Sequence, residues 1–280
     1  EMSSFSGQLT RPAELGSFID GYEPSNLEKF LNQYLSWLSN DMRQTVGLKE
    51  IWCEEYLPFL LGKGFKCIQV IRDPRDLITS LNYGDGQLYG GRPKPLLFNV
   101  RAWRKSVAMC LKVASHPLHI KVKYEDLVNG SDRVITELLQ FLSLNNSDTE
   151  LSLSRVTDHD GHPWQSNSSH ISTSQITKKS VGKYKDILPR LTSAAIEALC
   201  LPEMNAMGYA TDLNMNKLNA YISELSFYEN LERPELASYL WGPRRREEEL
   251  ERAKLISNGN YRAEYFMFEE SFKTIRASAL

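Results

Sequence analysis

The sequence predicts an α/β domain with a central parallel sheet, followed by a helical C-terminal extension. Residues 67–71 form an apolar run with the length and composition of a buried parallel strand. A helix-start signal follows at once, and residues 119–124 alternate as a second strand before another helix. We therefore divide the chain into an α/β domain at residues 1–210 and an extension at residues 211–280.

Composition sets broad limits on the class of protein. With 280 residues, 41% of them hydrophobic, the chain can bury a substantial core, and its net charge of -2 argues against broad nucleic-acid binding. Four widely spaced cysteines show no metal or disulfide pattern and are predicted to be buried thiols. No transmembrane run or signal peptide is found, which favours the cytoplasm. The Golgi lumen is the alternative if an anchor lies upstream of Glu1.

The first half of the chain begins with an irregular segment and then becomes periodic. Apolar residues at helical spacing predict an amphipathic helix over residues 25–43. Residues 46–51 read as a short strand, and residues 52–61 as the helix that follows it. These elements are expected to be structural.

The turn after residues 67–71 is the most informative stretch. Asp73 is a good N-cap, Pro74 suits the first helical position, and Asp76 lies near the positive end of the helix. This places Arg72 at the carboxyl end of a strand and beside a helix N-terminus, where open α/β sheets bind anions. Ser80, eight residues after Arg72, falls in the second helical turn, where its hydroxyl can share that anion. The structural alternative is a plain turn in which Arg72 pairs with Asp76 or with an acid after the second strand, Asp126.

Further elements follow in order. Residues 84–95 are rich in glycine and proline and predict a loop, either beside a substrate site or a plain connector. Helices are predicted over residues 96–115, with Trp103 in the core, and over residues 132–144.

Residues 145–177 are polar and irregular, and they include Asp158-His159-Asp160-Gly161-His162. Two histidines three apart are no zinc signature without further ligands at set positions, so no metal site is predicted. A surface loop is the expected structure, with a loop that lines a substrate pocket as the alternative.

Residues 178–190 carry five Lys or Arg and one acid, a local charge that can focus a polyanion. Gly182 within this stretch allows close approach of the backbone to a phosphate. Beyond residue 214 the pattern is helical, with Arg244–Glu249 forming charge pairs on a solvated face. Aromatic residues in this tail predict packing against the main domain or a partner, including a second copy of the chain.

Three of these segments resemble the sulfotransferases that use 3′-phosphoadenosine 5′-phosphosulfate. The strand that ends in Arg-Asp-Pro-x-Asp with a serine at this spacing is similar to the family's 3′-phosphate segment, so the resemblance implies that Arg72 and Ser80 hold that phosphate. The Tyr-Glu-Asp-Leu that begins at Tyr124 implies a contact with the adenine. The basic segment resembles one that folds over the 3′-phosphate, although Tyr184 stands where a tryptophan is usual. Its implied ligands are Lys178, Lys179, Ser180 and Gly182.

The resemblance also implies a catalytic pair and reveals a departure. Family members place a catalytic histidine or glutamate about twenty residues before the phosphate-binding arginine, which implies Glu50 as general base and Lys49 as its electrostatic partner. Exposed strand-end charges are the alternative for both. The Gly-rich 5′-phosphosulfate loop, which ends in a Ser-Gly-Thr-Thr type run, is missing or truncated, and only Ser3-Ser4-Phe5 resemble its end.

The implied fold is a three-layer αβα domain related to P-loop nucleotide kinases. The implied reaction moves a sulfuryl group from 3′-phosphoadenosine 5′-phosphosulfate to a hydroxyl or amine of a carbohydrate or small molecule, without a metal. One alternative is a non-catalytic binding module that lacks the 5′ loop. Another is a kinase-like phosphotransferase, which needs a Gly-x4-Gly-Lys-Ser/Thr loop that the sequence does not contain.

Overall fold

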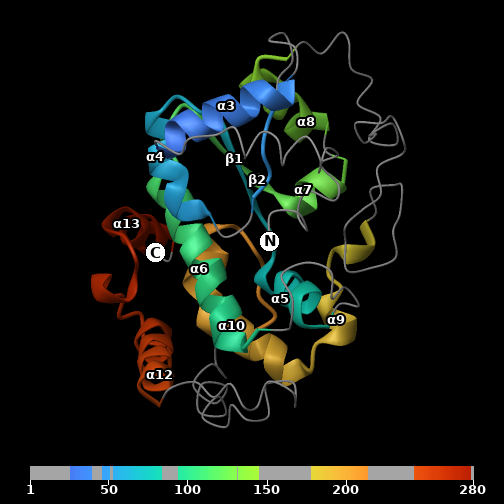
Figure 1. Cartoon of the computed structure of the whole chain (residues 1–280). Helices are drawn as coiled ribbons and strands as arrows, with labels where there is room; N and C mark the ends of the chain where they lie inside the picture. The colour runs from blue at the N-terminus through green and yellow to red at the C-terminus, as the bar shows by residue number, and fades with distance from the viewer. Residues whose placement is uncertain are drawn as a thin grey trace. The chain divides into compact units, whose positions relative to one another are not determined.

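The computed structural model describes residues 26–39, 46–50, 53–83, 94–130, 132–144, 178–213 and 243–278, and the statements below concern these residues. The chain divides into two compact units, which are described separately (Figure 1). The first comprises residues 1–53, 149–166 and 172–176. The second comprises residues 54–148, 167–171 and 177–280.

The first unit contains helix α3 (Leu27–Ser39), which confirms the predicted amphipathic helix with shorter ends. The side chain of Asn26 caps it by accepting a hydrogen bond of 2.8 Å from the amide of Lys29. Residues 46–50 have no regular secondary structure, so the predicted strand is wrong for these residues. A strand forms only where a neighbouring strand pairs with its backbone, and the residues of one segment do not by themselves supply that neighbour.

The second unit is built around two parallel strands, β1 (Cys67–Ile71) and β2 (His119–Lys123). Their register runs from Cys67 opposite His119 to Ile71 opposite Lys123. Both predicted strands are therefore confirmed. The expectation that the first is fully buried is wrong, because Ile68 and Val70 on alternate positions are 41% and 50% exposed. The sheet and its helices are compatible with an α/β domain, and the three-layer arrangement stays a prediction.

Helices precede, connect and follow the two strands. A 3-10 turn η1 (Glu54–Tyr56) and helix α4 (Leu57–Gly62) lead into β1. Helices α5 (Pro74–Tyr83) and α6 (Leu96–Lys112) connect β1 to β2. Helices α7 (Tyr124–Val128) and α8 (Asp132–Leu142) follow β2. The predicted helices are thus confirmed with small shifts at their ends.

The later part of the second unit is helical. It contains η4 (Lys178–Ser180), α9 (Tyr184–Ile187) and the long helix α10 (Arg190–Ala206). Helices α12 (Pro243–Ser257) and α13 (Glu269–Ser278) flank a 3-10 turn η8 (Ala263–Tyr265). Helix α10 packs against α5, α6, α12 and α13, which explains why it is apolar on most of its faces.

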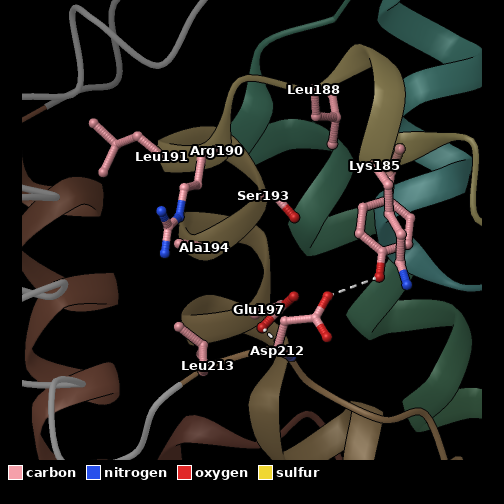
Figure 2. Close-up of a pocket in the computed structure, with 10 residues that line it drawn as sticks. Lys185, Leu188, Arg190, Leu191, Ser193, Ala194, Glu197, Asp212 and Leu213 are labelled. Atoms are coloured by element: carbon pink, nitrogen blue, oxygen red, sulfur yellow. Dashed lines mark hydrogen bonds between the residues drawn. The ribbon is translucent and has the colours of Figure 1, made fainter.

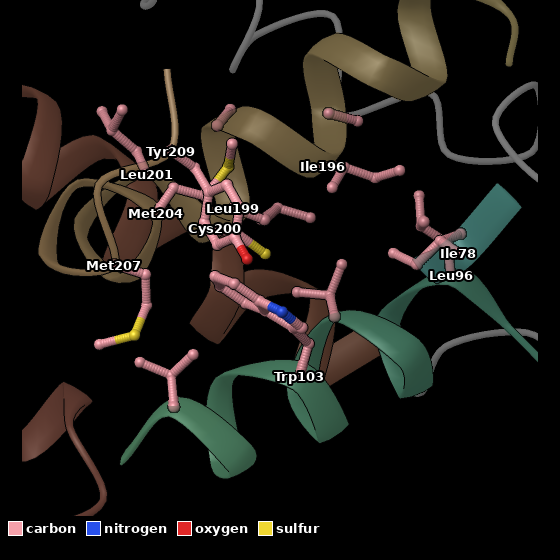
Figure 3. Close-up of a cluster of buried hydrophobic side chains, with 14 of the residues drawn as sticks. Ile78, Leu96, Trp103, Ile196, Leu199, Cys200, Leu201, Met204, Met207 and Tyr209 are labelled. Carbon is pink, nitrogen blue, oxygen red and sulfur yellow. The ribbon is translucent and has the colours of Figure 1, made fainter. Parts of the chain in front are cut away.

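The main hydrophobic core lies between α5, α6 and α10 (Figure 3). Helix α6 contributes one continuous stripe, because its buried residues recur at three- and four-residue spacing. The stripe consists of Leu96, Val100, Trp103, Val107 and Cys110. The predicted place of Trp103 in the core is confirmed, and its indole donates a hydrogen bond of 2.8 Å to the carbonyl of Arg72. The core therefore holds the end of β1 directly.

A buried charge cluster joins the C-terminal helices to this core. Arg252 on α12 donates a hydrogen bond of 2.6 Å to Glu203 on α10. Arg104 on α6 lies 3.6 Å from Glu203 and pairs with Glu249 of α12. The C-terminal tail thus packs against the main domain through α12, which is one of the two alternatives predicted from its aromatic residues. The domain boundary at residue 210 stays a prediction, since residues 214–242 lie outside the described ranges.

None of the four cysteines, which all lie in the described ranges, forms a disulfide. Cys67, Cys110 and Cys200 are buried as predicted, whereas Cys53 is only partly buried. Burial raises the pKa of Cys110 to about 11, so this thiol is unreactive at neutral pH. None of the helices in the described ranges has the length and apolar character needed to cross a bilayer. The polar stretch with Asp158 and His162 and most of the glycine-rich loop lie outside the described residues.

Candidate functional site

The site is organised by the turn between β1 and α5. Ile71 ends the strand, Pro74 opens the helix, and the carboxylate of Asp73 accepts a 2.9 Å hydrogen bond from the amide of Arg75. This confirms Asp73 as the N-cap. Arg72 therefore lies at the carboxyl end of a parallel strand and next to the positive end of a helix dipole, where negative charge is favoured.

The guanidinium of Arg72 is held in place but is not saturated. Its Nη2 donates a hydrogen bond of 2.6 Å to the carbonyl of Ser180, and its Cζ lies 4.5 Å from the centre of the Tyr124 ring. Its Nε is buried and has no hydrogen-bond partner within the described part of the chain. Buried donors are nearly always satisfied in folded proteins. An unsatisfied guanidinium N–H therefore marks a position where an anion can bind.

Three segments that are far apart in the sequence thus meet at Arg72. Tyr124 opens α7, directly after β2, and Ser180 closes the η4 turn. Lys178 and Lys179 lie in the same turn and are exposed. Ser80 lies in the second turn of α5 and is half-buried. That its hydroxyl shares an anion with Arg72 stays a prediction.

Asp76 fixes the basic loop against α5. Its two carboxylate oxygens accept hydrogen bonds of 2.6 Å from the amide of Gly182 and 2.9 Å from the amide of Tyr184. Gly182 has a φ of +74°, a left-handed conformation that aims its amide at Asp76. Burial raises the pKa of Asp76, although the two amides and the charge of Arg72 oppose this rise. The predicted approach of the Gly182 backbone to a phosphate stays a prediction.

Glu125 fixes the strand end from the other side. Its Oε1 accepts a hydrogen bond of 2.9 Å from the amide of Asp73, the residue after Arg72. Its Oε2 lies 3.0 Å from the hydroxyl of Tyr209, which is also 3.1 Å from the carbonyl of Ile71. The Tyr-Glu-Asp-Leu segment therefore contributes a supporting carboxylate as well as the ring of Tyr124.

A second cluster of polar side chains is centred on Arg75, and its members are buried except for Asp212, which is exposed. Arg75 pairs with Asp73 at 2.6 Å and with Glu197 of α10 at 2.6 Å. Its guanidinium also lies 4.1 Å from the ring centre of Tyr184. The hydroxyl of Tyr184 donates a hydrogen bond of 3.1 Å to Asp212, whose amide in turn donates one of 2.9 Å to Glu197 (Figure 2). Because each member has a hydrogen-bond or ion-pair partner within the cluster, we interpret the cluster as a rigid support that positions the basic loop ending at Tyr184.

A cavity of about 670 Å³ opens on the outer side of this cluster. It is lined by residues of α9, α10 and the segment that follows Tyr209 (Figure 2), and Lys185 and Arg190 contribute positive charge to it. Burial raises the pKa of Glu197 in its wall, and the ion pair with Arg75 opposes this rise. The two carboxylates in the wall, Glu197 and Asp212, are already bonded to Arg75 and to backbone or hydroxyl donors.

The predicted catalytic pair belongs to the first unit. Lys49 and Glu50 are exposed, as expected of either a catalytic pair or strand-end charges. Their role stays a prediction. Among the described residues no group of three or more His, Cys, Asp or Glu is arranged to hold a metal ion.

Sequence reasoning missed the supporting residues Asp76, Glu125, Arg75 and Glu197. The sequence predicts Asp76 as a favourable charge at the helix start or as a partner of Arg72, yet its hydrogen-bond partners are amides 106 and 108 residues away. Backbone amides carry no sequence signature, so no local signal identifies such a contact. The Arg75–Glu197 pair spans 122 residues and is equally invisible to spacing.

Comparison with known proteins agrees with this geometry. A family model described as the sulfotransferase domain matches residues 55–208, which include both strands, Arg72, Tyr124 and the basic loop. No curated protein and no solved structure matches the chain. Since the matched region covers more than half of the 280 residues, this chain belongs to the sulfotransferase family.

Proposed function

We propose that this chain is a sulfotransferase that uses 3′-phosphoadenosine 5′-phosphosulfate as donor and a hydroxyl or amine as acceptor. The observation that carries the proposal is the buried Nε of Arg72 at the carboxyl end of β1, which has no hydrogen-bond partner among the residues that the structure describes. In a member of the sulfotransferase family, a cationic donor at the end of a strand and beside a helix N-terminus suits a nucleotide phosphate.

The residues around Arg72 fit the nucleotide by charge and by chemistry. Guanidinium, ammonium and hydroxyl groups suit the oxygens of a 3′-phosphate, and an aromatic ring suits a purine base. In this proposal the ring of Tyr124 contacts the adenine base of the nucleotide. The phosphate ligands are Arg72, Ser80, Lys178, Lys179, Ser180 and Gly182.

The donor supplies an activated sulfuryl group, and the chain supplies proton transfer and charge stabilisation. The acceptor oxygen forms a bond to sulfur while the bond from sulfur to the phosphate oxygen breaks, which leaves 3′-phosphoadenosine 5′-phosphate. Glu50 takes the proton that the acceptor hydroxyl loses, and Lys49 stabilises the negative charge that develops on the phosphate. Positive side chains thus do what metal ions do in phosphoryl transfer, so the proposal invokes no metal.

A non-catalytic binding module is the second candidate. Residues 1–280 contain no complete Ser-Gly-Thr-Thr type run for the 5′-phosphosulfate, and a module without that loop would bind the nucleotide without transfer. Both candidates predict that the nucleotide binds at Arg72, and they differ only in whether sulfuryl groups are transferred.

Transfer of radiolabelled sulfuryl groups to a panel of phenols, alcohols, saccharides and amines tests the proposal. We expect label on at least one acceptor class, and Glu50→Gln is expected to lower kcat by about 10²–10⁴-fold, the usual contribution of a general base. Glu247→Gln, at an exposed position on α12, is the control and should transfer normally.

Each other outcome has a defined meaning. Binding of 3′-phosphoadenosine 5′-phosphate without transfer to any acceptor would support the binding module. Transfer of phosphate from ATP would support the kinase-like alternative. Full activity of Glu50→Gln would exclude the proposed base and leave the donor assignment intact.

A further inference from the structure

One buried carboxylate holds the backbone of the loop that follows Lys178, while the side chain of Tyr184 at the end of the loop packs on Arg75 and donates to Asp212. Asp76 is 2% exposed, and both of its oxygens are bonded to amides of this loop, at Gly182 and Tyr184. A buried carboxylate is costly unless it is hydrogen-bonded, so the two amides and Asp76 stabilise each other. This attachment is independent of the lysine side chains, which extend into solvent.

The loop also contacts the end of β1 through the hydrogen bond between Ser180 and Arg72, which differs from the bonds to Asp76 because it uses a proposed anion ligand. The carbonyl of Ser180 accepts its hydrogen bond from Arg72, whose guanidinium is the proposed anion ligand. An anion that binds Arg72 competes for this donor, whereas the bonds to Asp76 are made by backbone amides and use none of the proposed phosphate-binding side chains. The two bonds to Asp76 therefore persist when the site is filled, and they hold the loop backbone nearer the lysines than the Tyr184 side chain does.

The geometry explains why the attachment matters for binding. Lys178 and Lys179 are long and exposed, and they approach an anion at Arg72 only while their backbone stays docked. Docking them in advance reduces the ordering that binding requires. Val181, Gly182 and Lys183 connect these lysines to α9, and the hydrogen bonds to Asp76 fall within this connection.

We propose that Asp76 is a positioning residue that keeps the loop from Lys178 to Tyr184 docked beside Arg72, and that it thereby sets the affinity of the site for the 3′-phosphate. The effect on affinity rests on the proposed function, because that function supplies the ligand. The docking of the loop by Asp76 does not depend on the proposed function.

Asp76→Asn is the informative variant, because it preserves volume. Its amide oxygen can accept from one of the two loop amides, while its NH2 group faces the other. By calorimetry we expect affinity for 3′-phosphoadenosine 5′-phosphate to fall about ten- to hundred-fold, the usual effect of losing a hydrogen bond to a charged group. Affinity for adenosine 5′-phosphate, which lacks the 3′-phosphate, should change less than about threefold. Asp132→Asn, an exposed aspartate in the first turn of α8, is the control and should leave both affinities unchanged.

Hydrogen exchange without nucleotide provides an independent measurement. The amides of Gly182 and Tyr184 should be protected in the intact chain and should exchange at least about tenfold faster in Asp76→Asn. Equal protection in the two proteins would overturn the docking role. Equal loss of affinity for both nucleotides would also overturn it, since general unfolding produces that pattern. If the intact chain binds neither nucleotide, the proposed function fails together with the affinity claim. The exchange rates then decide the docking role alone.

Discussion

Replacing Arg252 by methionine should break the cluster that joins the C-terminal helices to the domain. Arg252 is 2% exposed and donates 2.6 Å and 3.0 Å hydrogen bonds to Glu203 and to the carbonyl of Leu199. The change leaves the carboxylates of Glu203 and Glu249 with Arg104 as their remaining buried guanidinium among the described residues. Removing one partner of a buried ion pair costs about 3–5 kcal/mol. We expect the free energy of unfolding to fall by that amount.

Urea denaturation followed by circular dichroism measures this change, and the same helix provides a matched control. Arg244 pairs with Glu248 at 3.2 Å, but its side chain is 93% exposed. Arg244→Met should therefore cost less than about 0.5 kcal/mol. Adding Glu203→Gln to Arg252→Met should recover part of the loss, because it removes an uncompensated charge. If Arg252→Met costs no more than Arg244→Met, the cluster does not hold the tail and the reasoning is wrong.

Two further predictions concern single positions. Gly182 has a φ of +74° and no atom lies within 4 Å of an added Cβ, so Gly182→Ala should cost only backbone strain. Urea denaturation should show a loss of about 1–2 kcal/mol for Gly182→Ala and a smaller loss for Gly182→Asn, since asparagine tolerates this conformation; equal losses would contradict the strain argument. Burial, and after it the charges of His116 and Lys121, lowers the pKa of His119 below its ordinary value of 6.5. The unfolded chain then binds a proton at His119 more readily than the folded chain does. The contribution of His119 to the free energy of unfolding is therefore complete above pH 6.5 and is lost as the pH falls through the lowered pKa. His119→Gln should flatten the dependence of the urea midpoint between about pH 7 and about pH 5, and an unchanged slope would contradict this.

The sequence was sufficient to predict the local geometry of the site. The strand at residues 67–71, its end before Arg72 and the cap at Asp73 are confirmed because each depends on neighbouring residues only. The helical stripe with Trp103 at its centre is confirmed for the same reason. Periodicity and capping are local properties, and local properties can be read from the chain.

Features that depend on distant partners could not be predicted in the same way. Nothing near Asp76 indicates that it binds amides more than a hundred residues away. The burial of Arg252 beside Glu203 likewise contradicts the usual exposure of arginine on a charged helix. The strand expected at residues 46–51 is wrong for the described residues because apolar alternation alone does not supply a pairing neighbour. Sequence patterns therefore located the strand end at Arg72 and the cap at Asp73, and they missed the residues that support this turn.

Calorimetric titration with 3′-phosphoadenosine 5′-phosphate, on the intact chain and on Arg72→Ala, tests the central claim most directly. The account predicts binding by the intact chain and a loss of about 1.5–3 kcal/mol in the variant, because a charge-assisted contact to phosphate disappears. Arg244→Ala, at an exposed position far from β1 in the sequence, is the control and should bind normally. Equal binding by Arg72→Ala and the intact chain, or no binding by the folded intact chain, would contradict the assignment of this site.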